Sequence, residues 1–271
     1  MITIGLEGDH VPALGFGTWQ ITGSECRHAV LDALEIGYRH IDTARIYGNE
    51  EEVGSAIASS GIPREQIFLT TKIWWRDLAY RDARVSALES LHRLGTDFVD
   101  LLLIHWPNPE IPLEEPLRAL VELKDEGRAR HIGVSNFDAA LLTAALARAP
   151  VACIQAEYHP LTRQDDLLEI ARRRGLLFTA YSPLARGQVR RDPLLKRIGE
   201  RHGKSAGQVA LRWLLQQERV AAIPKAARSE HRRENFAVFD FELSADEMEA
   251  ITTLSHGRAG SEPAARQGQR R

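Results

Sequence analysis

Cysteine is scarce in this chain of 271 residues. The only two cysteines, Cys26 and Cys153, cannot build a disulfide framework, and we interpret each as a small buried side chain rather than a nucleophile. This usage is typical of proteins in a reducing compartment, and we predict a cytoplasmic location.

Long apolar runs and an excess of one charge are also missing. No segment approaches the ~20 apolar residues that span a bilayer. The first ten residues, MITIGLEGDH, lack the basic segment and apolar run of a signal peptide. Lys and Arg total 35 against 37 Asp and Glu, which gives a formal net charge of −2. We therefore expect neither a membrane nor nucleic acid as a partner.

Predicted strands and helices alternate along most of the chain. Apolar segments on either side of a Gly and Asp turn predict an N-terminal hairpin from residues 2–4 and 11–14. Strands are then predicted at residues 15–18, 38–41, 67–71, 99–104, 131–134, 151–155, 176–181 and 220–223. Helices are predicted after an N-cap at Ser24, over residues 49–59, 80–94, 114–126, 138–147, 164–174 and 205–217, and from a capping box of Ser244 and Glu247 to about Leu254.

Eight strands, each followed by helical sequence, indicate a parallel sheet that is covered on both faces. The runs FLTT, VDLLLI and LLFTA are largely apolar and do not alternate with polar residues, which agrees with such strands. The phosphate-binding pattern GxGxxG of open sheets is absent, because GFGTW supplies only two of the glycines. We therefore predict a single α/β domain over residues 1–271, a (β/α)8 TIM barrel with an N-terminal β-hairpin, a C-terminal extra helix and a tail at 255–271 whose last residues, 266–271, are mobile.

Chemically active side chains stand at three consecutive strand ends. Asp42, Lys72 and His105 end successive predicted strands, and Tyr47 lies in the loop after the first of them. Each has an ordinary explanation by itself, as a cap, an ion-pair partner or loop packing. The carboxyl ends of barrel strands meet at one mouth, so four compatible groups at these positions favour an active site.

The chemistry of these four groups suits a carbonyl. A tyrosine has a pKa near 10, and we expect the Lys72 ammonium to lower the pKa of Tyr47 so that it can act as a proton donor. Asp42 would hold Lys72 charged, and His105 would orient a C=O by a hydrogen bond. The set contains no nucleophile, and a hydride from a nicotinamide cofactor fits this gap.

The segments GFGTW, GYRHIDTARIYGNEEEVG, FLTTKIW, DLLLIHWP, IGVSNF, IQAEYHP, YSPLARG and IPKAARSEHRRENF resemble the aldo-keto reductase superfamily. They occur in that family's order over about residues 3 to 255, and the short loops are most similar to the bacterial 2,5-diketo-D-gluconic acid reductase-like group. The resemblance implies a monomeric, NADPH-dependent reductase of aldehydes and ketones, with diketo sugar acids or small reactive aldehydes as substrates. It implies Tyr47 as the general acid and Asp42, Lys72 and His105 as its catalytic partners.

The resemblance also implies a cofactor site. Ser135, Asn136 and Gln155 would bind the nicotinamide carboxamide, and Tyr181 would stack on its ring. Ser182, Leu184 and Gly187 would line the loop over the pyrophosphate, Lys225 would meet the 2′-phosphate, and Glu234 and Asn235 would reach the adenine. The remaining members of the predicted cofactor set are Gly17, Thr18, Trp19, Asp42, Ile223, Ala226, Arg228 and His231.

Two positions depart from the family pattern at the phosphate. Ala226 stands where the family commonly has Ser, and His231 where it usually has Arg. A neutral imidazole is a poorer phosphate partner than a guanidinium. We expect Arg228, Arg232 and Arg233 to compensate in part, so that NADPH is preferred by a narrowed margin and NADH is also used.

Four of the five tryptophans, Trp19, Trp74, Trp75 and Trp106, follow predicted strands near the mouth. We predict an aromatic substrate funnel, and we expect Arg258 in the tail to attract an anionic group. The predicted substrate residues are Trp19, Tyr47, Trp74, His105, Trp106 and Asn108.

Two other functions are compatible with parts of this pattern. His40, Asp42 and His105 could serve a metal-dependent barrel hydrolase, although the ligand motif is sparse and we predict no metal. A non-catalytic, nicotinamide-binding subunit that senses redox state is the other alternative.

Overall fold

The computed structural model describes residues 2–254. Its main sheet is eight-stranded and entirely parallel, with the strands adjacent in chain order. The strands are β3 (Phe16–Gly17), β4 (His40–Asp42), β5 (Phe68–Ile73), β6 (Val99–Ile104), β7 (Ala129–Ser135), β8 (Val151–Glu157), β9 (Leu177–Tyr181) and β10 (Val220–Ala222). Every residue of β5 and β6 is buried, which agrees with the prediction of strands covered on both faces.

The sheet closes on itself where the chain segment before β3 meets β10. Leu14 forms a parallel bridge with Ala222. The Gly15 N–H donates to the Ala222 carbonyl at 2.9 Å, and the Ala222 N–H donates to the Ala13 carbonyl at 2.8 Å. The predicted (β/α)8 barrel is therefore confirmed, and the first and last strands form its seam.

The glycines of GFGTW are needed at this seam. A Cβ on Gly17 would lie 2.8 Å from the backbone oxygen of Ile223, and a Cβ on Gly15 would lie 2.8 Å from the His40 ring. Only a residue without a side chain allows this approach, so the seam requires glycine at both positions.

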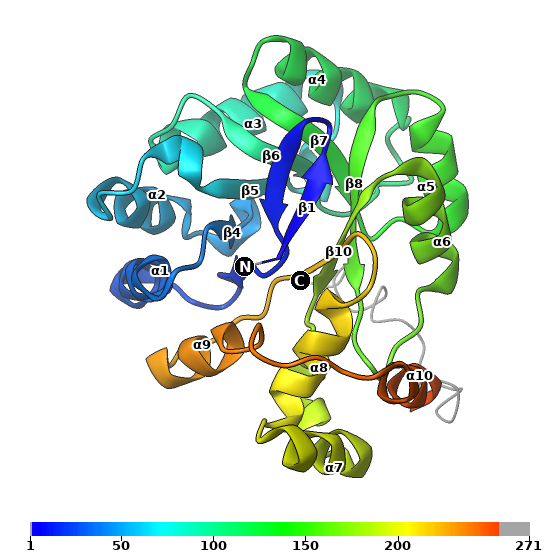
Figure 1. The fold of residues 1–271 in the computed structure, drawn as a ribbon. Coiled ribbons are helices and arrows are strands. Elements are labelled where there is room, and N and C mark those ends of the chain that lie inside the picture. Colours follow the sequence, from blue (N-terminus) through cyan, green and yellow to red (C-terminus); the bar gives the residue numbers. More distant parts are fainter. Residues whose placement is uncertain (1, 255–271) are drawn as a thin grey trace.

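The predicted hairpin forms from β1 (Thr3–Leu6) and β2 (Asp9–Pro12) and lies across the amino-terminal end of the barrel (Figure 1). His131, near the start of β7, has its Nδ1 2.9 Å from Glu7 Oε2 and its Nε2 2.8 Å from Asp9 Oδ2. The hairpin thus covers this end, and the carboxyl ends of the strands form the other one.

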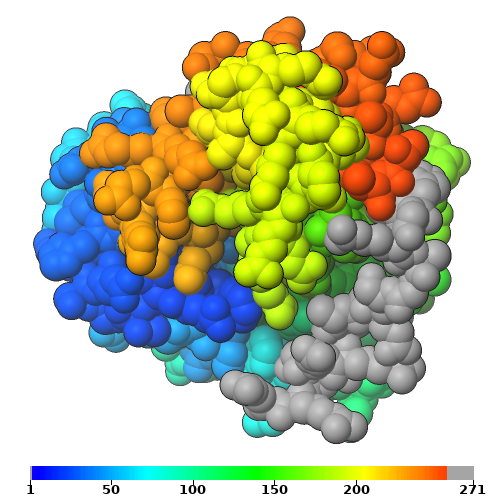
Figure 2. Space-filling model, turned by 90° about the horizontal axis from the view of Figure 1, so that it is seen from below, coloured from blue at the N-terminus to red at the C-terminus, as the bar shows by residue number. Residues whose placement is uncertain are grey.

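Helices surround the barrel (Figure 1). They are α1 (Gly23–Ile36), α2 (Glu50–Ser59), α3 (Tyr80–Leu94), α4 (Glu114–Asp125), α5 (Ala139–Leu146), α6 (Asp165–Arg174), α7 (Pro193–His202), α8 (Ala206–Leu215), α9 (Ser229–Phe236) and α10 (Ala245–Thr252). In the space-filling view α9 lies between α1 and the α7–α8 pair (Figure 2). The capping box of Ser244 and Glu247 opens α10 as predicted. No helix of the described chain combines the length and the apolar character needed to cross a membrane.

One helix start was predicted wrongly, and helices α7 and α9 were not predicted. Ser24 is not the N-cap of the first helix, because α1 begins at Gly23 and Thr22 occupies the cap position. Helix α7 was not predicted, although Asp192 caps it by accepting hydrogen bonds from the N–H groups of Leu194 (2.9 Å) and Leu195 (3.2 Å). Pro193 at its first position is a further start signal that the sequence already contained.

Candidate active site

The four predicted catalytic side chains come together at the carboxyl end of the barrel. Asp42 ends β4, Lys72 lies near the end of β5, His105 follows β6, and Tyr47 closes a turn of 3₁₀ helix after β4. Lys72 Nζ lies 2.5 Å from Asp42 Oδ1 and 5.2 Å from the centre of the Tyr47 ring. The rings of Tyr47 and His105 are 5.6 Å apart, edge to face.

Lys72 and Asp42 form a buried ion pair whose other hydrogen bonds are also made. Lys72 Nζ donates to the Thr43 carbonyl at 2.8 Å, and Gln155 Nε2 donates to Asp42 Oδ2 at 2.9 Å. Burial lowers the pKa of Lys72, and the adjacent Asp42 carboxylate opposes that shift. The pair therefore fixes the ammonium beneath the Tyr47 ring.

The expectation that Lys72 lowers the pKa of Tyr47 was wrong. The pKa of Tyr47 is raised well above its ordinary value, first by burial and then by the nearby Asp42 carboxylate and Tyr181. The ammonium faces the ring, and it donates hydrogen bonds to Asp42 and to the Thr43 carbonyl. Tyr47 is accordingly a neutral phenol at physiological pH, the form that can donate a proton.

His105 is a neutral imidazole in the same site. Burial and the positive charge of Lys72 hold the pKa of His105 well below its ordinary value. Its ring packs against Tyr47 on one side and lies 5.3 Å from Trp74 on another. Its buried Nδ1 has no hydrogen-bond partner among the described residues.

The residues predicted to hold a carboxamide lie next to this set. Tyr181 O–H donates to Asn136 Oδ1 at 2.7 Å, and Asn136 Nδ2 donates to the His105 carbonyl at 2.8 Å and to Ser135 Oγ at 3.1 Å. Asn136 takes a left-handed backbone conformation, with φ of 62°. Gln155 contacts Asp42 and Asn136 contacts His105, so the predicted carboxamide site adjoins the catalytic residues.

The segment after β9 reaches across the mouth. Ser182 and Leu184 lead into it, and the backbone is left-handed at Ser182 (φ 47°), Arg186 (φ 52°) and Gly187 (φ 90°). The Arg186 guanidinium lies 5.7 Å from the centre of the Trp19 ring, in the loop after β3. This contact joins the predicted pyrophosphate loop to the loop after β3, two strands away around the barrel, where Gly17 and Thr18 lie.

At the predicted phosphate end, Lys225 and Arg228 are exposed, whereas Arg232 is buried. Arg232 Nε lies 2.6 Å from Asp32 Oδ2, and its Nη1 donates to the carbonyls of Ala226 (2.9 Å) and Ala227 (2.7 Å). The expectation that Arg232 compensates for His231 was therefore wrong, because its donors already bind this chain.

Other predicted cofactor residues lie around α9. Ile223 follows β10, and His231 and Asn235 lie in α9, where Asn235 is buried. Glu234 Oε1 accepts a hydrogen bond from Ser205 Oγ at 2.5 Å, and its Oε2 lies 3.7 Å from Arg190. In its predicted role as an adenine contact, the Glu234 carboxylate would be shared with Ser205 and Arg190.

Asn136 and Gln155, beside Tyr181, form an amide-lined cradle that fits the carboxamide of a nicotinamide dinucleotide, which needs donors and acceptors. The exposed Lys225 and Arg228 near α9 fit its phosphates, which need positive charge. Of the predicted substrate residues, Trp19 is 41% exposed, and Trp74 packs against His105. Asn108 joins its loop to the one after β5, donating to the Trp75 carbonyl at 3.0 Å and accepting from the Glu110 N–H at 2.9 Å. Arg258 lies outside the described residues.

Sequence reasoning missed the residue that ties the loops of the site together. Asn49 Oδ1 accepts from Thr43 Oγ1 at 2.7 Å, while Asn49 Nδ2 donates to the carbonyls of Thr18 (3.0 Å) and Ile21 (2.8 Å). Asn before a helix usually indicates an N-cap, but this side chain makes no cap hydrogen bond to α2. It instead holds the loop that carries Trp19 beside the Asp42 strand end.

The alternative metal site does not assemble. His40 Nδ1 lies 3.1 Å from the Pro12 carbonyl and its ring packs on Phe68, while Lys72 and Gln155 engage the Asp42 carboxylate. Within residues 2–254, no three His, Cys, Asp or Glu side chains are grouped to hold a metal ion.

The fold places this chain among the (β/α)8-barrel proteins with their chemistry at the carboxyl ends of the strands. The model of the Aldo/keto reductase family matches residues 13–256. The chain therefore belongs to the aldo/keto reductase family and is an oxidoreductase.

Individual relatives are similar over nearly their whole length. An aldo-keto reductase of Mycolicibacterium smegmatis is 44% identical, over 95% of this chain and 94% of its own. The glyoxal reductase of Bacillus subtilis is 40% identical, over 94% of each chain. A solved structure provisionally assigned as a 2,5-diketo-D-gluconic acid reductase B superposes with a TM-score of 0.92 at 46% identity, covering 96% of this chain and 94% of its own.

Proposed function

We propose that this protein is an NADPH-dependent reductase of aldehydes and ketones, with Tyr47 as its general acid. The observation that supports this most is the convergence of a neutral phenol, a neutral imidazole and the buried Lys72–Asp42 pair beside an amide-lined cradle. The residues predicted to bind the cofactor, from Gly17 and Thr18 to Asn235, keep that role in this proposal. We further propose that the enzyme is cytoplasmic and monomeric.

Each residue has a defined task in the proposed reaction. The bound nicotinamide supplies the hydride to the carbonyl carbon. The Tyr47 O–H donates its proton to the carbonyl oxygen, and the Lys72 ammonium stabilises the phenolate that remains. His105, as a neutral imidazole, donates a hydrogen bond that orients the carbonyl. Asn136 and Gln155 hold the carboxamide relative to His105 and Asp42, and Trp74 helps to exclude water.

The substrate class is proposed from the relatives together with the pocket. One relative is a glyoxal reductase, and one similar structure carries a provisional diketo-gluconic acid reductase assignment. Both are named for small oxygen-rich carbonyl compounds. We propose small reactive aldehydes or diketo sugar acids, with Trp19, Trp74, Trp106 and Asn108 as the lining.

The direct test is single-turnover oxidation of bound NADPH by carbonyl compounds in the presence of a strong chelator. Methylglyoxal, an aromatic aldehyde and a diketo sugar acid form the panel, and loss of the reduced-nicotinamide absorbance is the readout. We expect oxidation by at least one member at an unchanged rate with chelator. Tight NADPH binding without oxidation by any member would instead favour the redox-sensing subunit, and activity lost on chelation would favour a metal enzyme.

Cofactor selectivity gives a second test. With His231 in place of the usual Arg and Arg232 bound to Asp32, we expect kcat/KM to favour NADPH by less than about a thousandfold, roughly 4 kcal/mol. His231→Arg should widen the preference by about tenfold, the effect of one added charged hydrogen bond. His92→Arg, on the exposed face of α3, makes the same change of side chain elsewhere and should leave the ratio unchanged. Equal effects of both variants would argue against a phosphate contact at residue 231.

A further inference from the structure

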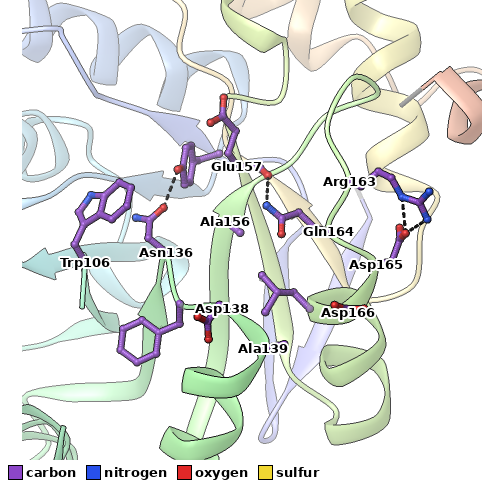
Figure 3. A pocket seen from close by; sticks show the side chains of 13 residues that line it. Trp106, Asn136, Asp138, Ala139, Ala156, Glu157, Arg163, Gln164, Asp165 and Asp166 are labelled. Carbon is purple, nitrogen blue, oxygen red and sulfur yellow. Dashed lines mark hydrogen bonds and ion pairs between the residues drawn. The ribbon is translucent and has the colours of Figure 1, made fainter. Parts of the chain in front are cut away.

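Tyr47 and Trp74 lie on neighbouring loops of the site, and both rings pack on His105. The ring centres are 5.6 Å apart for Tyr47 and His105 and 5.3 Å apart for Trp74 and His105, and both pairs are arranged edge to face. The cavity of about 400 Å³ beside Trp106 and Asn136 (Figure 3) has neither Tyr47 nor Trp74 in its lining. Contacts outside that cavity therefore position these two rings.

A single guanidinium connects the two loops. Arg45 and Tyr47 are the first and last residues of the 3₁₀ turn after β4, and Asp77 ends the 3₁₀ turn that follows Trp74. Arg45 Nε lies 3.4 Å from Asp77 Oδ2, and the Asp77 N–H donates to the Trp74 carbonyl at 2.9 Å. The contacts therefore form a closed ring that includes both loops, with the buried His105 on one side and Arg45 on the other.

Helix α3 anchors this guanidinium. Arg45 Nη2 lies 2.7 Å from Glu89 Oε2, and Ser86 Oγ donates to Asp77 Oδ2 at 3.1 Å. The hydrogen bond with Arg45 lowers the pKa of Glu89, so this carboxylate is ionised at neutral pH. The Arg45 side chain is only 28% exposed, and its Nη1 is buried without a hydrogen-bond partner among the described residues. Packing as well as charge therefore fixes its position.

The loop that carries Tyr47 has a second anchor on its other side. Asn49, two residues after Tyr47, donates to the carbonyls of Thr18 and Ile21 and so joins this loop to the one after β3. Since β4 lies between β3 and β5 in the sheet, the loop is tied to both of its neighbours. Loss of Arg45 would free only the side that faces the loop after β5, because the Asn49 anchor remains.

We propose that Arg45 is a positioning residue, which holds the Tyr47 hydroxyl and the Trp74 ring in a fixed arrangement so that the phenol can donate its proton to the substrate carbonyl. This inference rests on the proposed reductase function. With the anchor removed, the phenol takes many orientations and few of them reach the carbonyl oxygen, so the effect falls on kcat. None of the residues proposed to bind NADPH lies in the turn Arg45–Tyr47, so cofactor binding is unaffected.

Arg45→Met tests this role in two backgrounds. In the otherwise unchanged protein, kcat for reduction of an aromatic aldehyde should fall about tenfold, while the Kd of NADPH, measured by nicotinamide fluorescence, stays the same. In the Tyr47→Phe variant, the same substitution should change kcat by less than about twofold, because the hydroxyl group that Arg45 positions is already gone. A general loss of structure would instead lower kcat in both backgrounds alike.

Arg84→Met is the matched control. Arg84 of α3 also bridges two carboxylates, those of Glu122 and Glu126 at the end of α4, and its side chain is 24% exposed. Its loss should change the urea unfolding midpoint about as much as the loss of Arg45, and leave kcat within about twofold. Arg45→Lys keeps the charge but loses the fork that spans two carboxylates, so kcat should fall only about threefold.

An equal loss of kcat from Arg45→Met in both backgrounds, or no loss in the unchanged protein, would overturn the positioning role and leave the reductase function standing. If Arg45→Met does not fold, Arg45→Lys is measured in the same two backgrounds, and its loss of kcat must again disappear when the Tyr47 hydroxyl is absent. Failure of the unchanged protein to reduce any aldehyde would overturn both proposals.

Discussion

Replacing Tyr47 with phenylalanine is expected to reduce kcat for aldehyde reduction by at least about 100-fold, the usual contribution of a general acid. The substitution removes only the hydroxyl group. The ring remains to pack against His105 at 5.6 Å and to cover the Lys72 ammonium at 5.2 Å. Binding of NADPH, followed by nicotinamide fluorescence, should therefore be unchanged.

Tyr80→Phe is the matched control for this variant. Tyr80 also donates a hydrogen bond to a carboxylate, that of Glu122, but it lies on α3 and makes no contact with the four catalytic groups. Its loss should leave kcat within about twofold of the original, since no charge develops there in the transition state. If Tyr47→Phe retained more than a tenth of the activity, another group would have to donate the proton.

Replacing Lys72 with methionine should have the largest effect on the fold as well as on activity. The substitution leaves Asp42 buried without its cation, and breaking such a pair from one side costs about 3–5 kcal/mol of unfolding free energy. We also expect kcat to fall at least about 100-fold, because the phenolate formed at Tyr47 loses its counter-charge. Urea unfolding followed by tryptophan fluorescence measures the stability, and steady-state reduction measures the activity.

The double variant Lys72→Met with Asp42→Asn separates these two effects. Removing both charges should recover most of the lost stability, because no isolated charge is then buried, while activity stays low. Arg93, whose Nε lies 2.9 Å from the buried Glu50, offers a comparison. Arg93→Met should destabilise the protein with little loss of kcat, since Lys72 keeps its own pair with Asp42. Full activity in the double variant would show that the buried pair is structural only.

Much of the barrel could be predicted because its strands and helices have local sequence patterns that identify them. β6 and α3 were predicted with the bounds that the structure has, since one is a largely apolar run without alternation and the other follows a helical period. Helix α7 was overlooked because the sequence after β9 was interpreted as a longer connection. The convergence of Asp42, Lys72 and His105 followed from strand ends alone, because a parallel barrel brings those ends to one side.

What the sequence could not provide depends on neighbours far along the chain. The raised pKa of Tyr47 comes from burial under tertiary contacts, which no local pattern encodes. The role of Arg232 depends on Asp32, two hundred residues earlier. The bracing role of Asn49 depends on where Thr18 and Ile21 pass, which the sequence around Asn49 does not show. Such contacts between distant residues can be identified only from the folded structure.

The seam between residues 13–15 and Ala222 determines when this molecule can become complete. Its two edges are separated by about four-fifths of the chain, so the enclosing ring cannot form while a nascent polypeptide is still short. Until the eighth strand leaves the ribosome, the first strand has a free edge able to pair with other chains. Synthesis therefore leaves a long interval in which this edge must be shielded, and a truncation just before Val220 should give an aggregating product rather than a smaller barrel.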